Sequence, residues 1–281
     1  MEIFGIDVAK WNGKIDWNKV KQQKSFAILK VTQKNNHVEE SFERNYAGAT
    51  NAGLPVGVYR YVYAKNIPEA KAEATAITKA CLGKNIPYGV WLDLEDKSIK
   101  NVGKTNLTSI IIEEANILCA AGFKVGIYCN KDWYDNILET DLLKKEFPFW
   151  IARYPLADHG KYNAGSKLNP RDYAVAWQYS SKGKVNGIAG NVDLDVLFDD
   201  ISGEFNPGKE MEHPVIKRGS VGEEVAIMQR KLIEKGFNVG KKGADGKFGK
   251  YTEKALIAFQ KANGLDGDGK CGRKTWTVLL K

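Results

Sequence analysis

The sequence predicts an irregular TIM-like (β/α) barrel with some helices missing, followed by a small all-α domain of three helices. Two observations lead to this fold class: strand-like runs that alternate with helical patterns, and a change of composition after residue 201. The strand-like runs are apolar, β-branched and aromatic, and they are Ile3–Val8, Phe26–Thr32, Val56–Ala64, Gly89–Leu94, Lys124–Cys129, Phe149–Tyr154, Ala174–Tyr179 and Val192–Phe198. Because they are almost continuously apolar, we expect a parallel sheet that is covered on both faces.

Helical patterns separate the early strand-like runs. They span Asp16–Gln23, Glu39–Ala52, Pro68–Leu82 and Thr105–Ala121. Gly53, Gly83 and Gly122 directly follow three of these patterns, as helix C-terminal signals do. The alternation weakens after the fifth run, because Pro155–Asp172 and Ser180–Asn191 have no helical pattern. We therefore expect helices to be missing on the later side of the barrel.

The composition divides the chain into a barrel domain at 1–201, a linker at 202–213 and a second domain at 214–281. The linker, Ser202–His213, lacks periodicity and contains Gly, Pro and charged residues. Beyond it, three short helices are expected at Val221–Lys235, Tyr251–Asn263 and Thr275–Leu280. A tight turn is expected at Gly243–Gly249. A domain this small has little room for a deep catalytic pocket, so catalysis is expected in the barrel.

The net charge of +8 is concentrated in the second domain. From Pro214 to the end there are 15 Lys and Arg against 7 Asp and Glu, whereas the rest of the chain is neutral. Such a basic domain is expected to bind a polyanion, either nucleic acid or an anionic bacterial wall. No apolar run reaches the roughly 18 residues of a membrane helix, so we expect no membrane insertion. Without a visible secretion signal, synthesis in a cytoplasm and release by another route are expected.

The sequence offers no motif for a metal or a cofactor. The four cysteines form no C-x-x-C pair, and no histidine stands near them at the spacing of metal ligands. Neither a zinc site nor a disulfide framework is therefore expected. Val102–Thr105 (VGKT) resembles the end of a phosphate-binding loop, but the required leading glycine is replaced by Ser98.

Acidic residues gather at the ends of three predicted strands. Asp7 ends the first, Asp93 and Glu95 end the fourth, and Asp193 and Asp195 lie in the eighth. Residues two apart in a strand share a face, and the first and last strands of a closed barrel are neighbours. We expect the carboxylates to converge, which would raise the pKa of some and leave others ionised. Glycoside hydrolysis requires one protonated carboxyl group that gives a proton to the leaving oxygen and one ionised carboxylate that stabilises the developing positive charge. A single acid at a strand end, by contrast, more often caps a helix or pairs with arginine.

Aromatic residues are frequent near the same strand ends. Their flat faces could stack on sugar rings, although most aromatic residues of a barrel serve in packing. The candidates are Trp11, Tyr61, Tyr63, Tyr128, Trp150, Tyr154, Trp177 and Tyr179.

Five motifs resemble glycoside hydrolase family 25 lysozymes in their order along the chain. They are Gly5–Gly13 (GIDVAKWNG), Trp91–Glu95 (WLDLE), Trp150–Tyr154 (WIARY), Trp177–Ser180 (WQYS) and Val192–Phe198 (VDLDVLF). The resemblance implies hydrolysis of the β-1,4 bond between N-acetylmuramic acid and N-acetylglucosamine. It implies that Glu95 is the general acid, that Asp93 is its partner carboxylate, and that Asp7 and Asp193 support them.

The same motifs add Arg153 and Gln178 to the candidate substrate contacts, which then comprise Trp11, Tyr61, Tyr63, Tyr128, Trp150, Arg153, Trp177 and Gln178. Arg60, within Tyr59–Tyr61 (YRY), departs from the family pattern, which has a histidine there. Whether Asp93 acts as a nucleophile or orients the substrate's own acetamido group is left open.

The second domain resembles bacterial peptidoglycan-binding domains of the three-helix type. The matching residues are Gly219–Gly222, Gln229, Asp245–Gly249, Thr252, Phe259–Gln260, Gly264–Leu265, Asp268–Gly269 and Thr275–Trp276. The resemblance favours peptidoglycan over nucleic acid as the partner. Together with the absent secretion signal, it indicates a phage endolysin released through a holin pore. A bacterial autolysin, a non-catalytic wall-binding protein and a chitin-cleaving barrel are the alternatives, and the oligomeric state is left open.

Overall fold

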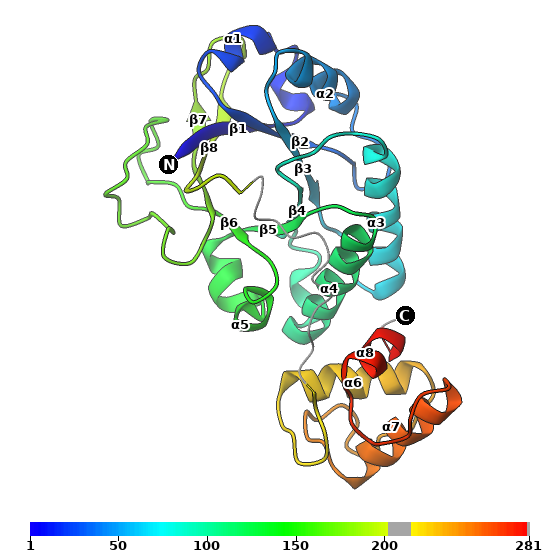
Figure 1. The fold of residues 1–281 in the computed structure, drawn as a ribbon. Helices are drawn as coiled ribbons and strands as arrows, with labels where there is room; N and C mark the ends of the chain where they lie inside the picture. Colours follow the sequence, from blue (N-terminus) through cyan, green and yellow to red (C-terminus); the bar gives the residue numbers. More distant parts are fainter. Residues whose placement is uncertain (202–214, 280–281) are drawn as a thin grey trace. The chain divides into compact units, whose positions relative to one another are not determined.

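A closed barrel of eight strands in chain order forms the first of two units into which the chain divides (Figure 1). The structure is a computed structural model and describes residues 1–201 and 215–279, so the predicted linker at 202–213 lies outside the described residues. The units are Met1–Gly208 and Lys209–Lys281. The strands are β1 (Ile3–Val8), β2 (Phe26–Lys30), β3 (Val56–Tyr61), β4 (Val90–Asp93), β5 (Val125–Asn130), β6 (Phe149–Ala152), β7 (Ala176–Gly183) and β8 (Val192–Leu197).

Helices cover the early half of the barrel and are scarce on the later half. Each of the first four strands is followed by a helix: α1 (Trp17–Lys21), α2 (Phe42–Asn51), α3 (Ile67–Cys81) and α4 (Lys104–Ala120). Side chains cap two of them, because Asp16 accepts from the Lys19 amide and Asn66 from the Glu69 amide. Short 3₁₀ segments precede α1 and α4, at η1 (Lys10–Asn12) and η2 (Lys100–Val102).

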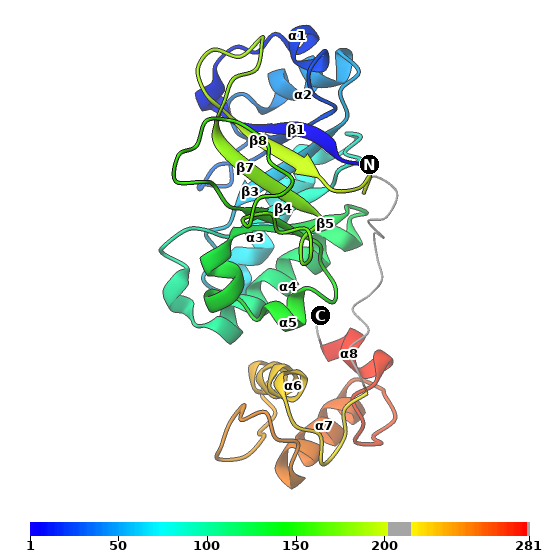
Figure 2. The same cartoon turned by 90° about the vertical axis from the view of Figure 1, so that its left-hand side faces the viewer.

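Within the described residues of the barrel, the helical segments after β5 are a π-helical turn, η3 (Trp133–Ile137), and α5 (Thr140–Leu143), neither of which was predicted. The connections from β6 to β7 and from β7 to β8 contain no helix, and long loops run there instead (Figure 2). The prediction of an irregular barrel with missing helices is confirmed. In the part of the chain that the structure describes, no helix combines the length and apolar character needed to cross a membrane.

The prediction of a wholly parallel sheet is wrong for β8. This strand pairs antiparallel with β7 and with β1, whereas the other neighbouring strands pair in parallel. The reason is the connection from β7 to β8, which is too short for the crossover that parallel strands require. Apolar runs report burial and carry no information about strand direction. As a result, the beginning of β8 lies where the seven parallel strands end.

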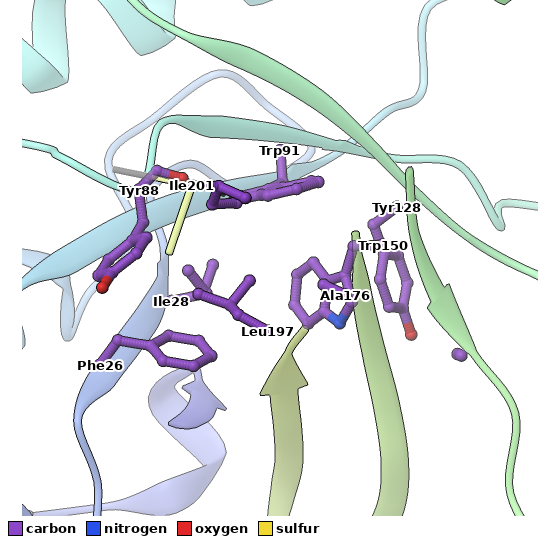
Figure 3. Close-up of a cluster of buried hydrophobic side chains, with 10 residues drawn as sticks. Phe26, Ile28, Tyr88, Trp91, Tyr128, Trp150, Ala176, Leu197 and Ile201 are labelled. Carbon is purple, nitrogen blue, oxygen red and sulfur yellow. Dashed lines mark hydrogen bonds between the residues drawn. The ribbon is translucent and has the colours of Figure 1, made fainter. Parts of the chain in front are cut away.

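Large side chains fill the barrel interior below that end. They come from several strands and include Phe26, Ile28, Trp91, Tyr128, Trp150 and Leu197, as Figure 3 shows. Two glycines make room for them. A Cβ at Gly5 would lie 2.4 Å from the ring of Phe26, and one at Gly126 would lie 2.4 Å from the ring of Trp91. The interior is a packed core, so substrate chemistry is confined to the end where the acids lie.

The described part of the second unit, residues 215–279, contains three helices, α6 (Glu223–Glu234), α7 (Lys250–Ala262) and α8 (Arg273–Leu279). Its core includes two buried glutamines with matching hydrogen bonds. Gln229 Nε2 donates to the side chains of Asp245 and Thr252 and to the Lys247 carbonyl, and its Oε1 accepts from Gly246 N.

Gln260 makes the corresponding bonds with Asp268, Thr275, Lys270 and Gly269. The loops Asp245–Gly249 (DGKFG) and Asp268–Gly272 (DGKCG) are therefore structural equivalents, and the unit contains an internal repeat.

Candidate active site

The acids of the first and last strands face each other directly. Asp7 and Asp193 are paired residues in the register of β1 and β8, and this pairing depends on the reversed direction of β8. Asp7 is buried, whereas Asp193 is half-buried. Asp7 accepts a hydrogen bond from Gln178 Nε2 of β7 at 2.6 Å. The predicted proximity of Asp7 and Asp193 is therefore present in the structure.

The second pair of acids lies on the end of β4. Asp93 is the last residue of that strand and is paired with Tyr61 of β3 and Tyr128 of β5. Glu95 follows two residues later and is half-buried, while Asp93 is buried. Among the described residues, Asp93 Oδ1 is a buried oxygen without a hydrogen-bond partner. Such an atom is costly unless a ligand supplies a donor.

Burial and the charges of neighbouring acids raise the pKa of Asp7, Asp93, Glu95 and Asp193. For Asp7 the causes are burial, then the charges of Asp193 and Asp195. For Asp93 they are burial and the charge of Glu95, and for Glu95 they are burial and the charge of Asp193, each opposed by Lys30.

Burial and the charge of Asp158 raise the pKa of Asp193 to about 6. Carboxyl groups in this state can hold a proton at a pH at which ordinary carboxylates have lost theirs.

A fifth acid, Asp195, belongs to the same cluster. It is buried, it is paired with Gly5 of β1 and Gln178 of β7, and its Oδ1 accepts a hydrogen bond from Trp150 Nε1 at 3.1 Å. The resemblance assigned no role to it. Its spacing of two from Asp193 was the available signal, since residues two apart in a strand share a face.

Gln178 connects the aromatic side of the site to the acids. Its Oε1 accepts a hydrogen bond from Tyr128 OH at 2.8 Å and another from Tyr154 OH, while its Nε2 donates to Asp7. Because both ends of the amide are engaged, Asp7 is held in a fixed orientation. Gln178 is buried, so it acts on Asp7 from within the barrel wall.

The candidate sugar contacts differ in how far their side chains are exposed to solvent. Trp11 is 83% exposed on η1, and Tyr61 and Tyr63 are half-buried and stacked with ring centroids 5.1 Å apart. Tyr128 and Trp150 are buried inside the barrel, where they bond to Gln178 and Asp195.

The structure does not bring Trp177 and Arg153 to the acids. Trp177 is 2% exposed, packs against Tyr162 and Tyr179, and donates through Nε1 to the Arg153 carbonyl. The Arg153 guanidinium reaches Tyr173 OH at 3.4 Å. Both residues stand next in sequence to inward-facing neighbours, Gln178 and Ala152, so strand alternation turns them outward.

Arg60, which departs from the family pattern, also points away from the acids, into the layer beneath α3, where it pairs with Glu73. Across residues 1–201 and 215–279, no three His, Cys, Asp or Glu side chains are arranged to hold a metal ion.

Comparisons with known proteins assign both units to families. The profile of glycosyl hydrolases family 25 matches residues 6–188, and that of a peptidoglycan binding domain matches residues 221–279. The chain is 30% identical over 277 residues to an autolytic lysozyme of Clostridium acetobutylicum, a match that covers 96% of this chain and 76% of that protein.

Two solved structures share the fold. The catalytic domain of endolysin ply40 from bacteriophage P40 of Listeria monocytogenes has 23% identity and a TM-score of 0.61, covering 74% of this chain and 98% of that one. A bacterial lysozyme from Streptomyces coelicolor has 26% identity and a TM-score of 0.54, covering 70% of this chain and 92% of that one.

Proposed function

This chain belongs to the glycosyl hydrolases of family 25, and we propose that it is a lysozyme that cleaves the β-1,4 bond after N-acetylmuramic acid in bacterial peptidoglycan. The observation that carries the proposal is the cluster of Asp7, Asp93, Glu95 and Asp193 at one end of the barrel. Glu95 and Asp193 are the half-buried members of this cluster, and the pKa of Glu95 is raised by burial and by the charge of Asp193. A carboxyl group in that state can give a proton to a glycosidic oxygen.

The proposed mechanism divides the work among the acids. Glu95 protonates the leaving oxygen as the bond to the anomeric carbon breaks, and it then takes a proton from the attacking water. Asp93 stabilises the positive charge that develops on the sugar, either as a nucleophile or by orienting the acetamido group. Its unpaired Oδ1 supports the second role, since an acetamido N–H is a donor of the kind that it lacks. Asp7, held by Gln178, and Asp193 support this charge from the opposite wall.

The second unit is proposed to bind the bacterial wall and so to keep the barrel close to its substrate. The match to a peptidoglycan binding domain and the surplus of positive charge both support this role. A weak binder tethered to an enzyme raises the local concentration of substrate without adding a catalytic contact. An endolysin and a bacterial autolysin would carry out the same reaction with this arrangement.

Digestion of purified peptidoglycan tests the proposal, with chitin oligosaccharides digested in parallel. Mass spectrometry of borohydride-reduced products should show new reducing ends on N-acetylmuramic acid, and the Glu95→Gln variant should produce almost none. New reducing ends on N-acetylglucosamine would contradict the assigned bond. Preferential cleavage of chitin would identify a different substrate, and binding without cleavage would identify a wall-binding protein.

A further inference from the structure

Arg60 is a fully buried arginine whose guanidinium ties a loop to the barrel. Nη1 donates to Thr32 Oγ1 at 2.6 Å and to the Gln33 carbonyl at 3.0 Å, and Nη2 donates to Asn36 Oδ1 at 2.7 Å. Nη2 also lies 2.9 Å from Glu73 Oε1 of α3. A buried charge is tolerated only when it is paired and hydrogen-bonded, as both terminal nitrogens of Arg60 are, although Nε has no hydrogen-bond partner among the described residues. The planar guanidinium fixes the geometry of these contacts.

The loop that Arg60 holds, Thr32–Val38, is a tight hairpin at the end of β2. Thr32 and Val38 form an antiparallel bridge, and Gln33 N donates to the His37 carbonyl at 2.8 Å. Asn36 has a φ of 63°, a left-handed conformation in which asparagine is favoured among non-glycine residues. Because parallel strands end on the same side of a barrel, the loop lies at the end that holds the acids.

This loop carries Lys34 at its tip, and Lys30 lies at the end of the strand that leads into it. Lys34 Nζ is 4.9 Å from the ring centroid of Tyr63, and Lys30 Nζ is 5.3 Å from that of Tyr61. The two tyrosines stack on each other, and Lys30 lies close enough to Asp93 and Glu95 to oppose the rise in their pKa. Within the described part of the chain, neither lysine forms an ion pair. Lys30 therefore borders the acids, and Lys34 lies one tyrosine further out, over the ring that stacks on Tyr61.

We propose that the Arg60-held loop presents Lys34, beside Lys30, as a subsite for a carboxylate on the substrate. If the chain cleaves peptidoglycan as proposed above, that carboxylate belongs to the peptide attached to the muramic acid next to the cleaved bond. A neutral glycan such as chitin would not use these charges. Arg60 is a positioning residue in this arrangement, because it touches the loop and not the substrate. The rigid loop keeps Lys34 in place and so reduces the entropy lost on binding.

The test compares two soluble glycan–peptide substrates that differ only in whether the peptide carboxylates are free or converted to amides. The wild-type chain should show a higher kcat/KM for the carboxylate form. Lys34→Ala should reduce that preference by about 2–5-fold, which corresponds to an exposed charge pair. The preference should also weaken at high salt. Lys79→Ala, which removes an exposed lysine from the last turn of α3, is the matched control and should leave the preference unchanged.

Asn36→Gly tests the role of Arg60 without removing the buried charge. Glycine accepts the left-handed conformation but lacks the oxygen that Arg60 contacts. It should reduce the preference mainly through KM, with little change in kcat. An unchanged preference in Asn36→Gly would overturn the role of Arg60, and equal cleavage of both substrates by the wild-type chain would overturn the subsite. Cleavage of neither substrate would instead overturn the proposed function.

Discussion

Asp193→Asn should stabilise the protein at neutral pH even though it damages the site. Burial and the charge of Asp158 raise the pKa of Asp193 from 3.8 to about 6 in the folded chain. The folded state therefore holds this proton more tightly than the unfolded state does. The stability that Asp193 contributes is fully present below pH 3.8 and is lost as the pH rises through about 6. The shift of roughly two units corresponds to at most about 3 kcal/mol, at 1.36 kcal/mol for each unit.

Thermal unfolding of the wild-type chain and of Asp193→Asn at pH 7.5 and at pH 3.5 measures this effect. A gain of about 3 kcal/mol would raise the Tm of a domain of this size by roughly 6–12 °C at pH 7.5. The gain should disappear at pH 3.5, where the aspartate is neutral as well. Asp16→Asn is a control of the opposite sign, because hydrogen bonds with Lys19 lower the pKa of that helix-capping residue. Equal or lower stability of Asp193→Asn at pH 7.5 would refute the reasoning.

The remaining predictions concern catalysis, packing and binding. Glu95→Gln should lower the turnover of peptidoglycan by about 10²–10⁴-fold at an unchanged Tm, and near-normal wall lysis would exclude it as the proton donor. Asp93→Asn should be almost inactive. A trapped glycosyl-enzyme adduct in the wild-type chain would show that Asp93 acts as the nucleophile, whereas inhibition by a thiazoline analogue would indicate that Asp93 orients the acetamido group of the substrate. Asp195→Ala, which leaves Trp150 Nε1 without its acceptor, should cost about 1–3 kcal/mol in urea unfolding at pH 3.5, where the acid is neutral, and Asp195→Asn, which keeps an acceptor oxygen, should cost less. Residues 214–281 alone should sediment with purified peptidoglycan at low and high salt, and loss of all binding at moderate salt would reduce the module to a nonspecific basic patch.

The strands were predictable because each is buried on both sides and reads as an apolar run. The acids at their ends followed from the same pattern, since a strand end and a spacing of two define position and face. Strand direction was not predictable from burial, so the reversal of β8 was missed. The assignment of Trp177 and Arg153 relied on motifs that contain both inward-facing and outward-facing residues, and alternation in β6 and β7 would have separated the two kinds.

Two further features of the structure were not predicted, for different reasons. Arg60 lies 24 residues from the Asn36 side chain that it holds, so only the folded chain explains an arginine at that position. The internal repeat of the second unit is different, because its signal was present in the sequence. Thr252 and Thr275 follow DGKFG and DGKCG at the same distance. A glutamine of the preceding helix, Gln229 or Gln260, forms hydrogen bonds with each loop and its threonine.

The reversal of β8 also decides where the polypeptide leaves the barrel. Leu197 and Ile201 pack with Phe26 and Tyr88, at the end of the barrel opposite to the acids. Had β8 been parallel, with no helix after it, the chain would have emerged beside the reacting bond. With the exit on the far side, recombination can replace, lengthen or remove whatever follows residue 201 without disturbing the acids of the active site. The direction of a single strand thus allows the barrel to be fused to different C-terminal domains.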